Sequence, residues 1–276
     1  MTTEALEMTQ LSPDPHGLNR FDFGVRVPEK SEIFNEEEAQ KYITGCDIPE
    51  TADDLLLALE MQSLFGPMSI RRMKILDTMC GPGRLGREFL ELGTQHVVFH
   101  DGHETMITHA ITEASKVRQS GQIVESITSD VAHIRSDDNM FDLVICHNAT
   151  HQLSDQERLE ETMKEFVRIT VPGGHVVIAD FQRPATLELK KAASARLDVT
   201  NPEVVELLIP TYAASFSKEE FEGVLRSIPG IRKWSVMDAE PPKLTWETWQ
   251  RVNEDPFKGH LMDYSPASLR AIVQKR

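Results

Sequence analysis

Cysteine, long apolar runs and positive charge are all scarce in this 276-residue sequence. The three cysteines, Cys46, Cys80 and Cys146, lie far apart in apolar surroundings, which predicts reduced thiols and neither a disulfide framework nor a zinc site. No segment reaches the roughly 18–20 apolar residues that cross a bilayer, so we expect no membrane association. The first 17 residues contain neither a basic start nor an apolar stretch. We therefore expect no secretory signal and a cytoplasmic location. From the cysteine spacing, we also expect no metal.

The shortage of positive charge bears on partners. Lysine and arginine number 29 against 44 acidic residues, a formal net charge of −15. Binding to nucleic acid relies on basic side chains that neutralise phosphates, and here they are dispersed apart from short pairs such as Arg71-Arg72. We therefore expect a small-molecule substrate rather than nucleic acid. A homodimer is an alternative to a monomer that the sequence leaves open.

Short apolar runs alternate with amphipathic segments in the middle of the chain. The expected strands cover residues 73–78, 95–101, 122–130, 140–148 and 175–181, and the expected helices cover 83–93, 103–121 and 154–174. Ser154 and Glu157 form a Ser-x-x-Glu pattern that predicts the start of the last helix. This alternation predicts right-handed βαβ units and a parallel sheet covered by helices on both faces.

Helical patterns flank this region. Residues 31–45 and 51–66 predict two helices, with Asn35 and Thr51 as their N-caps. Residues 184–216 predict two short helices broken at 200–203 and at 209–212, before a capped helix at 217–230 and strands at 231–238 and 265–276. We expect an N-terminal tail and helical cap over residues 1–70, then one α/β domain over 71–276 with a helical insertion at about 184–216.

The loop after the first strand, DTMCGPGRLG at residues 77–86, contains a G-x-G-x-x-G pattern. With Asp101 at the end of the next strand, this pattern is typical of dinucleotide-binding sites. Two residues disfavour that interpretation. The Asp77 carboxylate would repel a pyrophosphate, and Pro82 removes one N–H group from the turn. A ligand that carries positive charge fits the loop better than NAD.

The loop resembles the first motif of the class I S-adenosylmethionine (SAM)-dependent methyltransferases, which commonly reads D-L-G-C-G-P-G. Further stretches follow in the family's order: VVFHDGHETMITHA at 97–110, SITSD at 126–130, FDLVICHNATHQL at 141–153 and RITVPGGHVVIADFQRP at 168–184. The resemblance spans residues 73–184 and is to the type 11/25-like, small-molecule methyltransferases. It implies a Rossmann-like, mostly parallel seven-stranded sheet with helices on both faces, a last strand that is antiparallel, and SAM as the cofactor.

The resemblance also implies which residues bind the cofactor. These are Asp77, Met79, Gly81, Gly83, Asp101, Gly102, Met106, Asp130, Val131, His147 and Asn148. Asp101 would accept the ribose hydroxyls, and Gly81 and Gly83 would let the backbone approach the cofactor closely. His147 and Asn148 would line the methionine portion.

The adenine side has simpler alternatives. By the resemblance, Asp130 and the Val131 N–H group would read adenine, with Met106 on its ring face. Asp130 could instead cap the following turn, and Met106 could fill the core. Asp77, likewise, could have no role other than to cap a turn.

His151 is the candidate general base, because the unperturbed pKa of histidine is about 6.5. A histidine here without chemical function is the alternative. The segments expected to cover the acceptor supply six candidate lining residues: Tyr42, Phe65, Phe181, Arg183, Tyr212 and Phe216. Four of them, Tyr42, Phe65, Tyr212 and Phe216, would contact the sulfonium through cation–π interactions. Arg183 could hold an acceptor carboxylate, although pairing with a surface acid is the favoured interpretation.

Met79 departs from the family motif, where glycine is usual. The loop could shift and leave methyl transfer intact. The amino-acid part of SAM could bind in another pose, so that its amine attacks its own γ-carbon and gives azetidine-2-carboxylate plus methylthioadenosine. Catalysis could also be lost, leaving a SAM-binding module. We expect in-line methyl transfer from SAM to an O, N, S or activated C atom of a small molecule, and an NAD-dependent oxidoreductase is disfavoured.

Overall fold

The computed structural model describes residues 16–18, 22–29, 37, 39–40, 42–43, 52–198, 202–239 and 268–276. The expected helix at 31–45 is represented there by helical residues 37, 39, 40, 42 and 43. Its predicted cap Asn35, the cap Thr51 and Cys46 lie outside the described residues. So does most of the segment that joins the last two strands.

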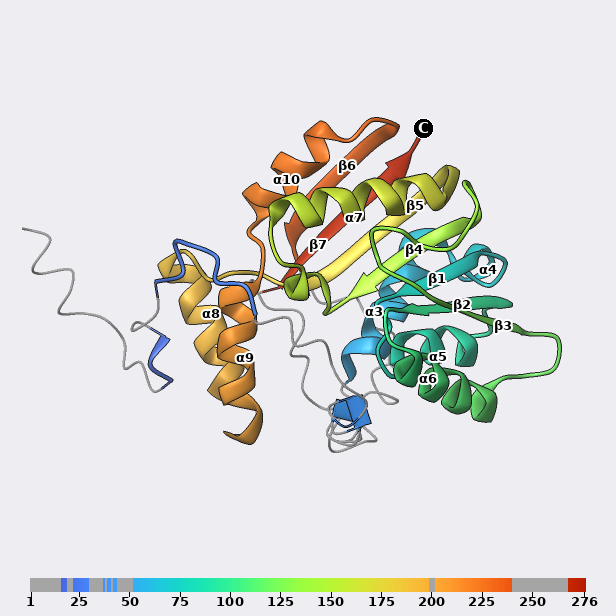
Figure 1. Cartoon of the computed structure of the whole chain (residues 1–276), viewed down its shortest axis with the longest axis horizontal. Helices are drawn as coiled ribbons and strands as arrows, with labels where there is room; N and C mark the ends of the chain where they lie inside the picture. Colours follow the sequence, from blue (N-terminus) through green and yellow to red (C-terminus); the bar gives the residue numbers. More distant parts are fainter. Residues whose placement is uncertain are drawn as a thin grey trace, which may run out of the picture.

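Seven strands form one sheet in the order β3-β2-β1-β4-β5-β7-β6 (Figure 1). The strands are β1 (Lys74–Thr78), β2 (His96–Asp101), β3 (Ile123–Thr128), β4 (Phe141–His147), β5 (Thr170–Phe181), β6 (Ile231–Asp238) and β7 (Ser268–Lys275). The first five run parallel, and β7 is antiparallel to both β5 and β6. The predicted mostly parallel sheet with an antiparallel last strand is confirmed.

Helices cover both faces of the sheet (Figure 1). The helices of the described residues are α3 (Ala52–Phe65), α4 (Pro67–Ile70), α5 (Arg84–Glu91), α6 (Glu104–Val117), the short 3-10 helix η3 (Thr150–Gln152), α7 (Gln156–Ile169), α8 (Leu187–Asp198), α9 (Pro202–Ala214) and α10 (Lys218–Ser227). One apolar core packs Leu57, Phe89 and Ala110 from α3, α5 and α6 against the sheet. On the other face, Phe166 of α7 and Phe221 of α10 do the same. Burial of these two faces fixes the sheet between its helical layers.

The start of α7 differs from the prediction. Asp155, rather than Ser154, is its N-cap, and the Asp155 side chain accepts a hydrogen bond of 2.8 Å from the Arg158 N–H group. The helix also ends at Ile169, because β5 begins at once with Thr170. The pairing of β4 with β5 then shifts, so that the Pro-Gly-Gly segment belongs to an irregular part of the strand instead of the helix.

The predicted break at residues 209–212 is wrong. Helix α9 continues through Pro210 to Ala214. Proline removes one helical hydrogen bond but does not have to end a helix. Tyr212, two residues after Pro210, is fully buried. It packs in a small core with Phe181 of β5 and Ala193 of α8. That packing holds the second half of α9 in place.

The parallel strands all end at one edge of the sheet, here named the carboxyl edge, which is formed by the ends of β1 to β5. Asp101, His147 and Phe181 are the last residues of β2, β4 and β5 there. Helices α8 and α9 stand together beyond this edge (Figure 1). In open α/β sheets ligands bind at this edge, next to the strand where the order reverses. Within the described part of the chain, no helix has the length and apolar character to span a membrane.

Candidate cofactor and acceptor site

Two buried carboxylates hold the loop between β1 and α5. Asp77, on β1, accepts a hydrogen bond of 2.9 Å from the Gly86 N–H group. Asp101, at the end of β2, accepts one of 2.9 Å from Gly81 N–H with Oδ2 and one of 3.0 Å from His103 N–H with Oδ1. These backbone donors fix both carboxylates at the carboxyl edge, while each carboxylate oxygen keeps a lone pair for a ligand.

The glycines of the loop are required by close packing. A Cβ atom on Gly83, whose φ is 76°, would lie 2.6 Å from the Cβ atom of Ala110. A Cβ atom on Gly86 would lie 2.2 Å from the ring of Phe99. Gly81 differs, since no atom lies within 4 Å of its Cβ position. The space beside Gly81 is therefore open to a ligand.

Met79 occupies a conformation that favours glycine. Its φ is 52°, in the left-handed region, where a residue with a Cβ atom carries a strain of about 1–2 kcal/mol. Its half-buried side chain packs against the core that contains Leu76 and Val98. The methionine is thus accommodated by turning its side chain toward the core while the backbone keeps the glycine-type conformation.

Three acidic side chains, Asp54, Asp77 and Asp101, lie close together at this loop. Asp77 is only 2 % exposed, and burial raises its pKa to about 7, with further raising by Asp54 and Asp101. The Gly86 N–H group and His147 act in the opposite direction. His147 Nδ1 lies 2.8 Å from Asp54 Oδ1, and both side chains are nearly buried. A positively charged ligand would relieve the repulsion among these carboxylates.

Asp54 was not identified from the sequence as a site residue. It lies in the first turn of α3, where acidic residues also serve to stabilise the positive end of a helix. That ordinary role concealed its contact with a histidine 93 residues away.

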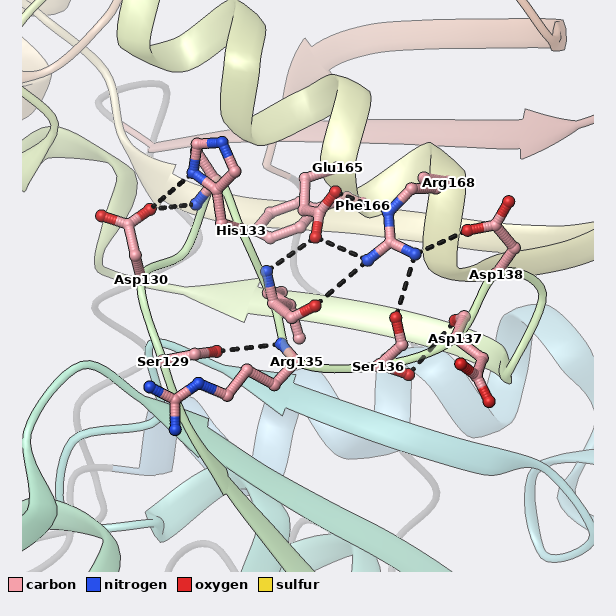
Figure 2. Close-up of polar contacts among 12 residues, drawn as sticks. Ser129, Asp130, His133, Arg135, Ser136, Asp137, Asp138, Glu165, Phe166 and Arg168 are labelled. Carbon is pink, nitrogen blue, oxygen red and sulfur yellow. Dashed lines mark hydrogen bonds and ion pairs between the residues drawn. The ribbon is translucent and has the colours of Figure 1, made fainter.

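Asp130 follows β3, and its contacts (Figure 2) are those of a residue that caps a turn, the alternative given for it above. Its Oδ1 accepts a hydrogen bond of 2.8 Å from Ala132 N–H, and its Oδ2 pairs with the Arg158 guanidinium of α7. Burial would raise the pKa of Asp130, but these two donors outweigh it and lower the pKa. Asp130 therefore caps a turn, yet its ionised side chain is 51 % exposed and still open to a ligand.

Met106 lies under the N-terminal segment. It is buried and clusters with Ala39 and Ile43, which are separated from it by more than 60 residues in the sequence. Ala39 and Ile43 therefore lie over the start of α6, on the side of the sheet edge where the adenine was predicted. Met106 contributes to this small core in the structure, as its alternative interpretation proposed.

The remaining predicted cofactor residues are distributed along the same edge. Gly102 is exposed directly after β2, and Val131 packs against the core beneath the loop after β3. Asn148 has a φ of 48° and donates its N–H group to the Ala179 carbonyl oxygen at 2.8 Å. The chain therefore turns sharply after β4, which directs the following residues across the end of β5.

His151, on η3, forms a buried pair with Asp180 of β5. The His151 Nδ1 atom lies 2.8 Å from Asp180 Oδ1, and Asp180 also accepts hydrogen bonds from the backbone N–H groups of His151 and Phe181 and from the Thr150 hydroxyl. Burial opposes a charged imidazole, but Asp180 outweighs it and the pKa of His151 is raised. The same contacts lower the pKa of Asp180 despite its burial. In the neutral form of His151, an ionised Asp180 makes Nδ1 the donor and leaves Nε2 as the proton acceptor.

Arg26, from the N-terminal segment, holds the loop that carries His151. Its guanidinium donates to the carbonyl oxygens of His151 at 2.9 Å, Ser154 at 2.8 Å and Leu153. It also lies 4.0 Å from the centre of the Phe216 ring. Nothing in the sequence around Arg26 signals this role, because its partners lie more than 120 residues away.

The predicted aromatic lining is mostly core. Tyr212 and Phe216 are fully buried, and Phe65 packs on the His175 ring, with 4.8 Å between ring centres, near the start of the regular part of β5. Phe65 is thus not brought to the carboxyl edge. Tyr42, at 43 % exposed, lies on the N-terminal helix. Of the predicted aromatic residues, Phe181 is the one brought to His151, with 5.8 Å between the ring centres.

Arg183 is buried, which corrects the predicted pairing at the surface. Its guanidinium donates to the carbonyl oxygens of Phe23 and Ser215 and pairs with Glu220 at 2.8 Å. These contacts join the N-terminal segment to the start of α10. With its donors used in this way, Arg183 connects segments of the chain and is not directed at an acceptor.

Comparison with known proteins adds family information to this geometry. Residues 75–174 match the family of methyltransferase domains. Two similar proteins are the ubiquinone/menaquinone biosynthesis C-methyltransferases UbiE of Idiomarina loihiensis, 28% identical over 125 residues, and of Pseudomonas fluorescens, 29% identical over 128 residues. Each match covers 44% of this chain and 47% of the relative, so the chain spans about half the length of these curated relatives.

Solved structures resemble the fold over most of the chain. The plantazolicin methyltransferase BpumL in complex with S-adenosylhomocysteine (SAH) has a TM-score of 0.61 at 16% identity and covers 88% of this chain and 91% of its own. An S-adenosyl-L-methionine-dependent methyltransferase described as putative, from Methanococcus maripaludis, has a TM-score of 0.61 at 19% identity, and the match covers 90% of this chain and 97% of that protein. At such identities the likeness establishes the fold.

Proposed function

We propose that the chain is a class I SAM-dependent methyltransferase that transfers the methyl group of SAM to a small-molecule acceptor, a proposal supported by the methyltransferase-domain match at residues 75–174 and by the strand order of the sheet. The observation that carries this proposal is the arrangement at the carboxyl edge. There, the acidic glycine loop and the pair of His151 and Asp180 lie at the ends of neighbouring strands. Such an edge can hold a cationic cofactor beside a proton acceptor.

The loop residues suit SAM in shape and charge. Asp101 would accept hydrogen bonds from the ribose hydroxyls, and the open space beside Gly81 would admit the cofactor next to the backbone. Asp77 and Asp54 would face the positive charges of the ammonium and the sulfonium. Ala39 and Ile43, packed on Met106, would cover the cofactor as part of the N-terminal cap.

SAM supplies an electrophilic methyl carbon, so the protein has to align the acceptor and receive its proton. His151 Nε2 would take that proton, and Asp180 would stabilise the imidazolium that results. This division of roles favours acceptors that lose a proton on methylation, such as a phenolic hydroxyl or an activated ring carbon. The UbiE relatives are C-methyltransferases, which is consistent with the second kind.

Calorimetry with SAM and SAH tests the cofactor assignment. Asp101→Ala should weaken binding of both by about tenfold or more, because hydrogen bonds to a charged group contribute about 1.5–3 kcal/mol. Asp137→Ala is the matched control, since it removes one exposed carboxylate from the loop before β4. Equal affinities for all three proteins would overturn the role of Asp101.

The acceptor side is tested with a panel of phenols and hydroquinones. His151→Gln should lower kcat by about 10²–10⁴-fold, the usual contribution of general-base catalysis, and leave SAM affinity unchanged. A variant that retains full kcat would show that His151 is not the base. Methylation of the acceptor would still support the transferase assignment in that case.

A further inference from the structure

Residues 22–29 of the N-terminal segment, here named the strap, lie against the end of helix α9 (Figure 1). The Val27 N–H group donates to the Ala213 carbonyl oxygen at 3.0 Å. The Thr211 hydroxyl donates to Glu29 Oε1 at 2.7 Å, although these two residues lie 182 positions apart in the sequence. The strap is therefore part of the folded unit that the helical insertion forms beyond the carboxyl edge.

Arg26 extends from the strap to helix η3, which carries His151. Its Nε atom donates to the Ala214 carbonyl oxygen at 2.5 Å. Its two terminal nitrogens donate to the carbonyl oxygens of His151, Leu153 and Ser154. The last carbonyl groups of a helix have no partner within the helix, and a cation beside them is favoured by the helix dipole. The Arg26 guanidinium therefore caps η3 at its carboxyl end.

Asp180 of β5 holds the same short helix from its amino end. It accepts hydrogen bonds from the Thr150 hydroxyl and from the His151 N–H group, and it pairs with the His151 imidazole. Helix η3 has three residues, a length at which a helix has too few hydrogen bonds of its own to be stable. Its position therefore depends on two side chains, an acid from the sheet and a base from the strap.

The contacts of Arg26 require a guanidinium group. Its nitrogens serve four carbonyl oxygens, and its central carbon lies 4.0 Å from the centre of the Phe216 ring. A guanidinium carries five N–H donors in a fixed planar arrangement, whereas an ammonium is a point charge with three donors. Arginine can therefore serve all four carbonyl groups at this position, and lysine cannot.

We propose that Arg26 is a positioning residue for His151. By capping η3, its guanidinium holds the imidazole against Asp180, so that Nε2 keeps one direction toward the acceptor. The catalytic consequence rests on the proposed function, in which His151 is the base, whereas the positioning itself is a property of the fold. A displacement of about 1 Å in a catalytic group can cost on the order of a hundredfold in rate, so loss of this cap has a measurable effect.

The kinetic test compares Arg26→Ala with the wild type on the phenol and hydroquinone panel. The variant should lower kcat by about tenfold to a hundredfold. It should keep the wild-type affinity for SAH in calorimetry, because the contacts described for Arg26 lie at η3 and at the end of α9. Millimolar guanidinium chloride should raise the kcat of the variant, since the ion can occupy the space of the lost group, and potassium chloride should not. Arg26→Lys should remain below the wild-type kcat.

Lys190→Ala is the matched control. Lys190 belongs to α8 and lies 5.6 Å from the centre of the Phe23 ring, so it contacts the same strap from another side. This variant removes one positive charge and one contact of the strap but leaves the cap of η3 in place. It should keep the wild-type kcat and show no response to guanidinium.

Proton NMR tests the positioning without any reaction. An Nδ1–H group that donates to a buried carboxylate gives a downfield imidazole signal, which His151→Gln should abolish and thereby assign. Arg26→Ala should shift or broaden this signal, because η3 loses its second support, and guanidinium should restore it. Lys190→Ala should leave the signal unchanged. If Arg26→Ala does not fold, the same comparison is made with Arg26→Lys, which keeps the charge and loses the planar donors.

Wild-type kcat and a wild-type imidazole signal in Arg26→Ala would overturn the proposal. A loss of kcat that guanidinium does not restore, with an equal loss of SAH affinity, would also overturn it, because a general structural effect would explain both. If the wild type methylates no acceptor while the imidazole signal still depends on Arg26 and on guanidinium, the proposed function fails and the positioning role stands.

Discussion

The buried carboxylate of Asp77 should make the folded protein less stable as the pH rises. Its pKa is raised from an ordinary 3.8 to about 7, chiefly because the side chain is buried. Each pH unit of such a shift corresponds to about 1.4 kcal/mol, so keeping Asp77 ionised in the fold costs about 4 kcal/mol. Asp77→Asn removes the charge and keeps an oxygen that can accept the Gly86 N–H group.

The sign follows from proton binding. Between about pH 4 and 7 the folded protein retains a proton on Asp77 that the unfolded chain has already released, so the stability of the wild type falls across this window. The Asn variant lacks this loss. Its free energy of unfolding should match the wild type near pH 4 and exceed it by about 4 kcal/mol above pH 7.

Urea unfolding of both proteins without cofactor, at pH values from 4 to 8, measures the difference directly. Groups that titrate equally in both proteins cancel in that difference. The same variant should bind SAM more weakly, because Asp77 faces the positive charges of the cofactor in the proposed site. A stability difference that does not change with pH, or a variant less stable than the wild type at pH 8, would refute the reasoning.

Other predictions concern the acceptor side and the glycine loop. Asp180→Asn should destabilise the protein by about 3–5 kcal/mol, because it removes the buried partner of His151. This loss should be largest below about pH 6.5 and shrink as the pH rises through the raised pKa of His151, which urea unfolding across that range would follow. Gly86→Ala should destabilise the protein by about 1–3 kcal/mol, because the added Cβ atom overlaps with the Phe99 ring. Gly81→Ala should cost about 1 kcal/mol, because the space beside Gly81 is open and only the backbone conformation is strained. Equal losses of stability in thermal unfolding would contradict this. Met79→Gly should change SAM affinity by less than about twofold in calorimetry, because the backbone already has a glycine-type conformation.

The sheet was predictable because each of its elements has a local signal. Short apolar runs separated by amphipathic segments specify βαβ units, and the glycine loop specifies the turn after β1. The errors occur where local signals conflict. Ser154 and Asp155 are both good N-caps, and in the structure Asp155 takes this place by accepting the Arg158 N–H group. Pro210 predicts a break in α9, but tertiary contacts of the second half of the helix prevent it.

The site was predictable only as far as its residues fall in motifs. His151 was identified from its position after β4, whereas Asp180 was not, although the two form one pair. Asp54 and Arg26 were missed for the same reason, since their partners come from distant segments and no periodic pattern links them. A motif shows which residues lie at the carboxyl edge, but the partners that set their pKa values follow from the folded structure.

The central claim is methyl transfer from SAM, and the nucleoside product tests it most directly. Mass spectrometry of the protein incubated with SAM and a hydroquinone or phenol acceptor should show SAH and methylated acceptor in equal amounts. Methylthioadenosine as the nucleoside product, formed with or without the acceptor, would contradict the claim. It would mean that the aminobutyrate part of SAM reacts, as in cyclisation to azetidine-2-carboxylate.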